Sequence, residues 1–328
     1  MKRKIIRQGH NTLTLTLPSK WAEKFNIKAG DEVDLTEQGK DLKISVEKKG
    51  NGEEIALIDI SGLIVPMVWR LISSVYRAGY NEVKISFEAK SFRDVYTSFT
   101  YNTIQVLKDG GEEQLSPLEA IQALVNRFIG FEIIEQKTNY CIIKDLGNTN
   151  LKEFDNTLRR IFLLLQTMSE AVLNNIKDDK KEELKGVHII DTNIDRFEDF
   201  CLRVLNKEGY SDFKKTPTMY SLILLLEMVG DEYKKLGLHL LKFKRPKNKN
   251  IIKFATYSDT MLKLFYDLYY DFSNKKAEQI YKTDKEYAEL FEKVYTDLTP
   301  EESELLHHLK KINIFMLSLT ELRIDLAY

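Results

Sequence analysis

The period of apolar and polar residues changes twice along the chain. Thr12 to Leu17 alternate strictly between polar and apolar positions, as expected for a half-buried strand. Strand-like and helix-like runs are mixed from about 53 to 147, and from about 151 onward apolar residues recur with a helical period. The pattern therefore predicts an α+β protein with three regions, 1–50, 53–147 and 151–328.

The first two regions should contain short elements. After the alternating strand, Pro18 opens a short helix, and two strands follow at 32–35 and 42–46. The middle region predicts a helix after Ser116, an N-cap residue with Pro and Glu at the favoured positions behind it. Its other predicted elements are a helix at 65–77 and strands at 55–60, 82–87, 131–135 and 140–144. Because some fifty residues bury only a thin core, the first region should need a partner chain.

The third region predicts a helical bundle. Six amphipathic segments are expected, at 158–176, 183–205, 217–242, 256–272, 275–295 and 300–327. Thr299 begins a capping box ahead of the last helix. A polar linker at 245–250 divides the helices into three plus three, which suggests a weak internal repeat of about 90–100 residues.

Composition narrows the function classes. With 49 basic and 50 acidic residues, the net charge of −1 gives no global attraction to nucleic acid or membrane. Two cysteines exclude a disulfide scaffold and a cysteine zinc site, and no signal peptide or apolar run of roughly 20 residues occurs. A cytoplasmic protein without membrane insertion is expected. Gly-rich phosphate loops, G-x-S-x-G and H-E-x-x-H are absent, so no catalytic residues are predicted and an enzyme is not expected.

Two pairs of carboxylates are the best chemical clue. Glu227 and Asp231 lie four residues apart in an otherwise apolar helix, and Asp191 and Asp195 repeat the spacing upstream. Each pair projects from one helix face, so together they could cage a cation. Oxygen ligands suit Mg²⁺, Mn²⁺ or iron better than structural zinc, and His188 could add a nitrogen ligand. Since the acids fall largely off the apolar stripe, the alternative is a solvated outer face of the bundle.

The N-terminal region resembles the AbrB/SpoVT family of swapped-hairpin domains. The resemblance rests on Arg7-Gln8-Gly9-His10, Leu13-Thr14-Leu15-Thr16-Leu17-Pro18, Trp21-Ala22 and Ile27-Lys28-Ala29-Gly30-Asp31-Glu32-Val33. It implies an intertwined homodimer that presents cations to DNA phosphates; these would be Lys2, Arg3, Lys4 and Arg7, with Lys20 and Lys24 as outer candidates. The alternative is a module that only dimerises the chain.

The helical region resembles PhoU, a family of helical-bundle regulators of phosphate uptake. The resemblance rests on Asp191-x-x-x-Asp195 and on Leu226-Glu227-Met228-Val229-Gly230-Asp231, and it implies a bundle that binds divalent or trivalent metal such as iron, Mn, Mg or Zn. The second half departs from the pattern. Lys282 and Glu286 stand where the first acid pair should recur, and Glu321 and Asp325 lie at another level of their helix, so one acidic site is expected.

The order of modules is similar to that of archaeal PhoU-domain regulators, as is the segment 126–135 that leads into the bundle. The resemblance implies a DNA-binding regulator of phosphate uptake whose bundle senses an effector or docks a phosphate-transport or signalling protein. Two alternatives remain open. The chain could be a protein–protein adaptor that does not bind DNA, or the carboxylates could form a metal centre for phosphoester hydrolysis.

Overall fold

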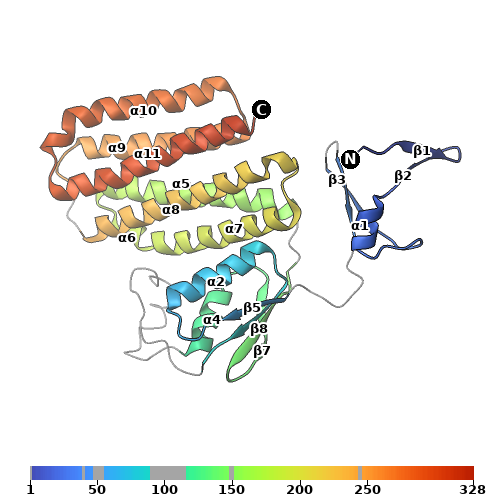
Figure 1. Cartoon of the computed structure of the whole chain (residues 1–328). Coiled ribbons are helices and arrows are strands. Elements are labelled where there is room, and N and C mark those ends of the chain that lie inside the picture. The colour runs from blue at the N-terminus through green and yellow to red at the C-terminus, as the bar shows by residue number, and fades with distance from the viewer. Residues whose placement is uncertain (1, 39–40, 47–54, 89–115, 148–150, 243–245) are drawn as a thin grey trace. The chain divides into compact units, whose positions relative to one another are not determined.

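The computed structural model describes residues 2–38, 41–46, 55–88, 116–147, 151–242 and 246–328 (Figure 1). The chain divides into two compact units, Met1–Glu53 and Glu54–Tyr328. Strand hairpins in the first unit, a mixed sheet and a helix-rich remainder confirm the predicted α+β class. Among the described helices, none is long and apolar enough to cross a bilayer.

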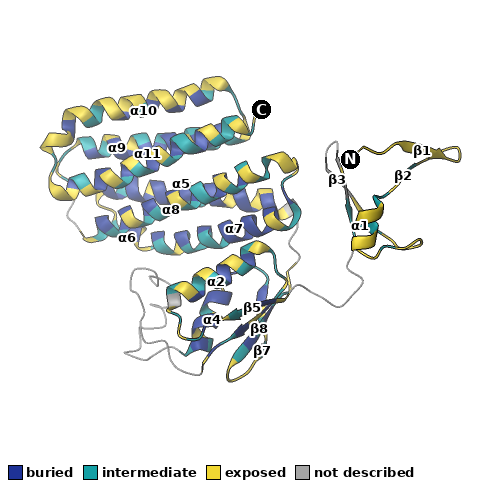
Figure 2. Cartoon of the chain, viewed as in Figure 1, coloured by how far each residue is buried: buried dark blue, intermediate teal, exposed yellow. Residues whose placement is uncertain are grey.

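The first unit consists of two antiparallel hairpins and one short helix. In chain order its elements are β1 (Ile5–Gln8), β2 (Thr12–Leu15), α1 (Ser19–Lys24), β3 (Asp34–Gln38) and β4 (Asp41–Ser45). Pro18 caps α1, as predicted. None of the side chains described in residues 2–46 is buried (Figure 2). The unit as a single copy therefore has no core of its own among these residues.

The second unit begins with a four-stranded sheet of order β5-β6-β8-β7. Its elements are β5 (Ile55–Asp59), α2 (Val65–Ala78), β6 (Glu82–Ser86), α4 (Pro117–Val125), β7 (Phe131–Gln136) and β8 (Tyr140–Asp145). Strands β5 and β6 are parallel, joined through α2, whereas β8 runs antiparallel to both β6 and β7. The predicted capping box at Ser116 is present. Helices α2 and α4 pack on this sheet around their own buried cluster, which includes Val68, Ile72, Ile85 and Ile143.

The remainder of the unit is helical. The helices are α5 (Leu151–Asp178), α6 (Lys181–Lys185), α7 (Val187–Glu208), α8 (Thr216–Lys242), α9 (Asn250–Tyr270), α10 (Asn274–Val294) and α11 (Pro300–Asp325). Helices α5, α7 and α8 pack on one another, and so do α9, α10 and α11. The two groups meet along α8 and α11 and along α5 and α9. The long helices are therefore arranged in two groups of three, as predicted.

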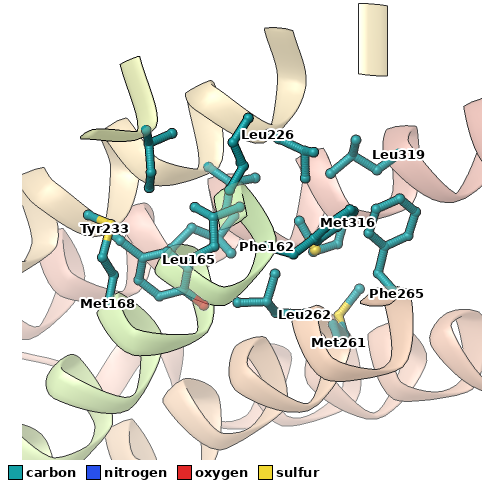
Figure 3. Close-up of a cluster of buried hydrophobic side chains, with 14 of the residues drawn as sticks. Phe162, Leu165, Met168, Leu226, Tyr233, Met261, Leu262, Phe265, Met316 and Leu319 are labelled. Carbon is teal, nitrogen blue, oxygen red and sulfur yellow. The ribbon is translucent and has the colours of Figure 1, made fainter. Parts of the chain in front are cut away.

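Side chains from both helix groups form one continuous core. Figure 3 shows Phe162 and Leu165 of α5 with Leu226 of α8, facing Phe265 of α9 and Met316 of α11. All five are fully buried. Because this interior is shared, the two halves of the bundle support each other's fold.

Three helix boundaries differ from the prediction. Helix α5 begins at Leu151, seven residues before the predicted start at 158. Helix α9 begins at Asn250, six residues before the predicted start, so that the linker is shorter than its polar composition indicates; Arg245 lies outside the described residues. The segment predicted as one helix from Glu183 divides at Gly186 into α6 and α7. Hydrophobic period alone does not mark such a break, because Leu184 and Val187 are buried on either side of it.

Candidate functional site

Helix α7 is buried on more sides than its apolar stripe indicates. Every residue from Glu198 to Leu205 is buried, including two acids and an arginine. Helices α5 and α8 cover one side of α7, and α2 packs on another. The expectation of a solvated outer face is therefore wrong for this part of the helix. The polar side is covered by α2 of the sheet domain, which is the part of the second unit that contains β5 to β8, α2 and α4.

Six carboxyl groups of α7 and α8 lie in this region. They are Asp191, Asp195, Glu198, Asp199, Glu227 and Asp231. Asp191, predicted from the sequence as part of a metal site, is only 2% exposed, and the side chain of Asp195 is 17% exposed. The structure thus brings the four predicted ligands to one side of the α7–α8 pair, as their helical spacing requires.

Basic side chains already contact three of the four predicted ligands. The Nζ atom of Lys234 lies 2.6 Å from Oδ2 of Asp191 and 2.5 Å from Oδ1 of Asp231. A nitrogen of the Arg127 guanidinium donates to Oδ2 of Asp195. The Lys234 ammonium therefore bridges α7 and α8.

The carboxylate of Glu227 is the exception. Among the described residues it takes part in no ion pair and no side-chain hydrogen bond. Burial raises its pKa to about 8, and the Asp231 and Asp195 carboxylates add to the effect. The Glu227 carboxyl group therefore takes up a proton at a higher pH than an ordinary glutamate does.

Burial also raises the pKa of Asp191, to about 7, with a further contribution from the neighbouring Asp195. For Lys234 burial acts in the opposite direction, but the Asp191 and Asp231 carboxylates outweigh it and hold the pKa above its usual value. The ammonium stays charged, and the acidic cluster carries fewer negative charges at neutral pH than it has carboxyl groups.

Two arginines reach the same acidic side from the middle of the chain. Arg77, at the end of α2, donates to Oε2 of Glu198 at 2.9 Å and also to Asp199. Arg127 follows α4, and its guanidinium stacks 4.1 Å from the ring centroid of Trp69. Both arginines are therefore fixed by more than one contact.

Arg203 makes the reverse connection, from α7 into the sheet domain. Its side chain is fully buried, and its guanidinium donates to the backbone oxygens of Tyr76 and Tyr80 at 2.6 and 2.9 Å. An ion pair of 2.7 Å joins it to Oδ2 of Asp145, whose side chain is 4% exposed. The rings of Tyr76 and Phe131 flank the guanidinium at 4.8 and 5.1 Å.

Among the described residues, no group of three or more His, Cys, Asp or Glu side chains has the arrangement needed to hold a metal ion. Metal binding by Asp191, Asp195, Glu227 and Asp231 stays a prediction, but three of these donors are already matched with cations. His188 is half-buried and makes no ion pair among the described residues. The donor set in this arrangement does not fit a metal.

In the second half of the bundle the acids at or near the corresponding positions are solvated. Glu286, Glu321 and Asp325 are exposed, as is Lys282. A single acidic site stays a prediction.

The N-terminal cations are fully available to solvent. Lys2, Arg3 and Lys4 precede β1, and Arg7 lies on it opposite Leu13. All four are exposed, and within the described part of the unit none makes an ion pair. DNA binding by these residues stays a prediction.

The same unit contains an open hollow of about 1030 Å³. Its apolar lining comes from α1, the following loop and β4, through Trp21, Phe25, Ile27, Val33, Ile44 and Val46. Several further apolar side chains of the hairpins are more than half exposed, including Ile5, Leu13 and Leu35. Such a surface is typical of a module that pairs with another chain.

Sequence reasoning missed the basic partners of the acids. Lys234 could have been found, because it lies three residues after Asp231 on the same face of α8. Arg203 also carries a signal, since it is a lone charge within the apolar run Phe200 to Leu205. Arg77 and Arg127 carry none, because they are distant in sequence from their partners.

Comparisons with known proteins give one family match and two similar solved structures. Residues 6–54 match the sequence model of the family described as MazE_antitoxin, "Antidote-toxin recognition MazE, bacterial antitoxin". Among solved structures the chain is similar to PhoU from Pseudomonas aeruginosa (19% identity, TM-score 0.46, 54% of this chain and 96% of that chain). It is also similar to the phosphate transport system regulatory protein PhoU from Streptococcus pneumoniae (17% identity, TM-score 0.42, 54% and 95%). No curated protein sequence matches the chain. The N-terminal unit is thus similar to MazE-type modules, and the chain has PhoU-like structural neighbours.

Proposed function

We propose that this chain is a cytoplasmic, non-enzymatic regulator of phosphate uptake that dimerises and binds DNA through its first unit. The phosphate assignment draws on the PhoU-like acidic motifs of α7 and α8 and on the three-plus-three order of the helices. The dimer and the DNA contact draw on the first unit. The main support for both is that the first unit has four exposed cations and buries none of its described side chains.

A second copy is the partner that suits this module. The alternating strand β2 leaves apolar side chains exposed, and the hollow beside α1 is lined by apolar residues. Pairing two copies would remove this surface from water at roughly 25 cal/mol for each Å² buried. The pairing would also double the number of cations available to a DNA backbone, from four to eight.

DNA binding is tested with the full-length chain across salt concentrations. Phosphate contacts make log K fall linearly with log salt, with a slope of about −0.9 for each contact. Removing Lys2, Arg3, Lys4 and Arg7 together should flatten the slope and weaken low-salt binding at least about tenfold. A matched control replaces Lys275, Lys282, Lys285 and Lys293, four exposed lysines of α10, with alanine.

Equal losses in both variants would refute a specific role for the N-terminal cations. If the unmodified chain does not bind DNA even at low salt, the second candidate is favoured. This is a protein–protein adaptor, and the toxin-recognition description of the matching family supports it. The role in phosphate control is tested separately, by measuring phosphate uptake in a strain that lacks this chain. Such a strain should continue to take up phosphate when phosphate is ample.

A further inference from the structure

The acidic side of α7 has more negative than positive groups. Six carboxyl groups meet the three cations Lys234, Arg127 and Arg77, with Lys235 at the margin, 3.6 Å from Asp231. An uncompensated carboxylate in such a buried place is costly, so it must find a cation or take up a proton. The role of this surface therefore depends on which groups supply the cations that compensate its carboxylates.

The Lys234 ammonium occupies the bridging position between the carboxylates that the sequence predicted for a metal ion. Its ammonium lies between Asp191 on α7 and Asp231 on α8, at 2.6 and 2.5 Å, and so cross-links the two helices. A divalent ion needs carboxylate oxygens at about 2.0–2.6 Å. It cannot share these oxygens with an ammonium at such short distance, so lysine and metal exclude each other here.

The other two cations come from a different domain. Arg77 ends α2 and Arg127 follows α4, both on the sheet domain, yet they pair with Glu198, Asp199 and Asp195 on α7. The Arg127 side chain is only 7% exposed. Buried pairs of this kind lose much of their stability when one partner is removed, because the other charge is left uncompensated.

A third connection runs the opposite way. Arg203 of α7 enters the sheet domain and pairs with Asp145 there, while Asn206 Nδ2 donates to the backbone oxygen of Arg77 at 2.6 Å. The contact between sheet domain and helix thus contains charge pairs of both polarities. Because each surface supplies both a cation and an anion, these pairs determine how the sheet domain and α7 are aligned, as well as how strongly they associate.

We propose that the acidic face of α7 and α8 is the docking surface for the chain's own arginine-bearing sheet domain, and that Lys234, Arg127 and Arg77 replace a metal ion there. The bundle and the sheet domain are joined without metal. A divalent cation can bind the four predicted ligands only where Lys234 and Arg127 have been displaced.

The metal content of the unmodified full-length protein is the first test. After incubation with Mn²⁺, Mg²⁺, Zn²⁺ or Fe²⁺ in separate samples and gel filtration, elemental analysis should find well under one ion per chain. Treatment with EDTA should leave amide hydrogen exchange in 65–78 and 187–208 unchanged. One ion per chain, lost in an Asp195→Ala/Asp231→Ala variant, would overturn the proposal, and so would faster exchange in these segments after EDTA.

The docking contact is tested by hydrogen exchange in variants. Arg127→Gln should raise exchange rates in 65–78 and 187–208 at least about tenfold, while segments 250–270 and 300–325 keep the parental rates. For the bridging lysine, Lys234→Met should speed exchange in α7, whereas Lys235→Met, at a side chain that is 46% exposed, should change it less than about twofold. Unchanged exchange in Arg127→Gln would refute the docking role. The metal content and the EDTA comparison of the unmodified protein need no variant, so they decide even if a variant fails to fold.

Discussion

Replacing Arg203 with methionine should destabilise the second unit strongly. Methionine keeps an unbranched apolar stem, but it removes the guanidinium with its donors to Tyr76 and Tyr80 and its 2.7 Å pair with Asp145. The Asp145 side chain, 4% exposed, is then left with Lys207 Nζ at 3.8 Å as its nearest cation.

The expected loss follows from these contacts. Breaking one side of a buried ion pair costs about 3–5 kcal/mol, because the remaining charge stays desolvated. The Tyr80 oxygen loses its Arg203 donor, which acts in the same direction, whereas the Tyr76 oxygen keeps the Gly79 N–H at 3.0 Å. Movement of Lys207 toward Asp145 acts against the loss. We therefore expect Arg203→Met to lower the free energy of unfolding by about 4 kcal/mol, a large part of an ordinary domain's stability.

Urea unfolding followed by helical circular dichroism measures this loss. Lys207→Met is the matched control, because it removes a cation from the same carboxylate at longer distance and should cost less than about 1 kcal/mol. A double-mutant cycle with Asp145→Asn should give a coupling energy of about 2 kcal/mol, since it removes both charges together. An Arg203→Met loss no larger than that of Lys207→Met would refute the reasoning.

Three smaller predictions concern single positions. Gly79→Ala should lower the free energy of unfolding by about 1–2 kcal/mol in urea, because Gly79 ends α2 at φ +94° and an added Cβ would lie 2.7 Å from the Lys207 side chain. Burial raises the pKa of Glu232, but the hydrogen bonds from His308 and Lys235 and the nearby Lys311 ammonium together outweigh it and lower the pKa from 4.5 to about 2. The stability from this carboxylate is present above pH 4.5 and lost as the pH falls toward 2, so Glu232→Gln should flatten the acid limb of a stability–pH curve. Thr299→Ala removes the capping box of α11 and should cost about 1 kcal/mol, measurable as a lower thermal midpoint.

Local patterns in the sequence predicted what depends on local geometry. The helical period located the bundle, and one-turn spacing placed Asp191 and Asp195 on a common face. Their environment could not be predicted in this way, because it depends on chain segments that lie far away in sequence. Arg127 precedes Asp195 by 68 residues and Arg77 precedes Asp199 by 122, so that no period connects them. The polar side of α7 therefore resembles a solvated face until the second domain is placed on it.

The lack of buried side chains in the first unit has a thermodynamic consequence. In the proposed dimer, a module that hides none of its described side chains would fold only on pairing, so its folding would be a reaction between molecules. Heating should then give two transitions with different concentration dependence. The midpoint of the first unit should rise with protein concentration, whereas that of Glu54–Tyr328, which has its own interior, should stay constant. The cellular abundance of the chain would thereby set how much of it can contact DNA.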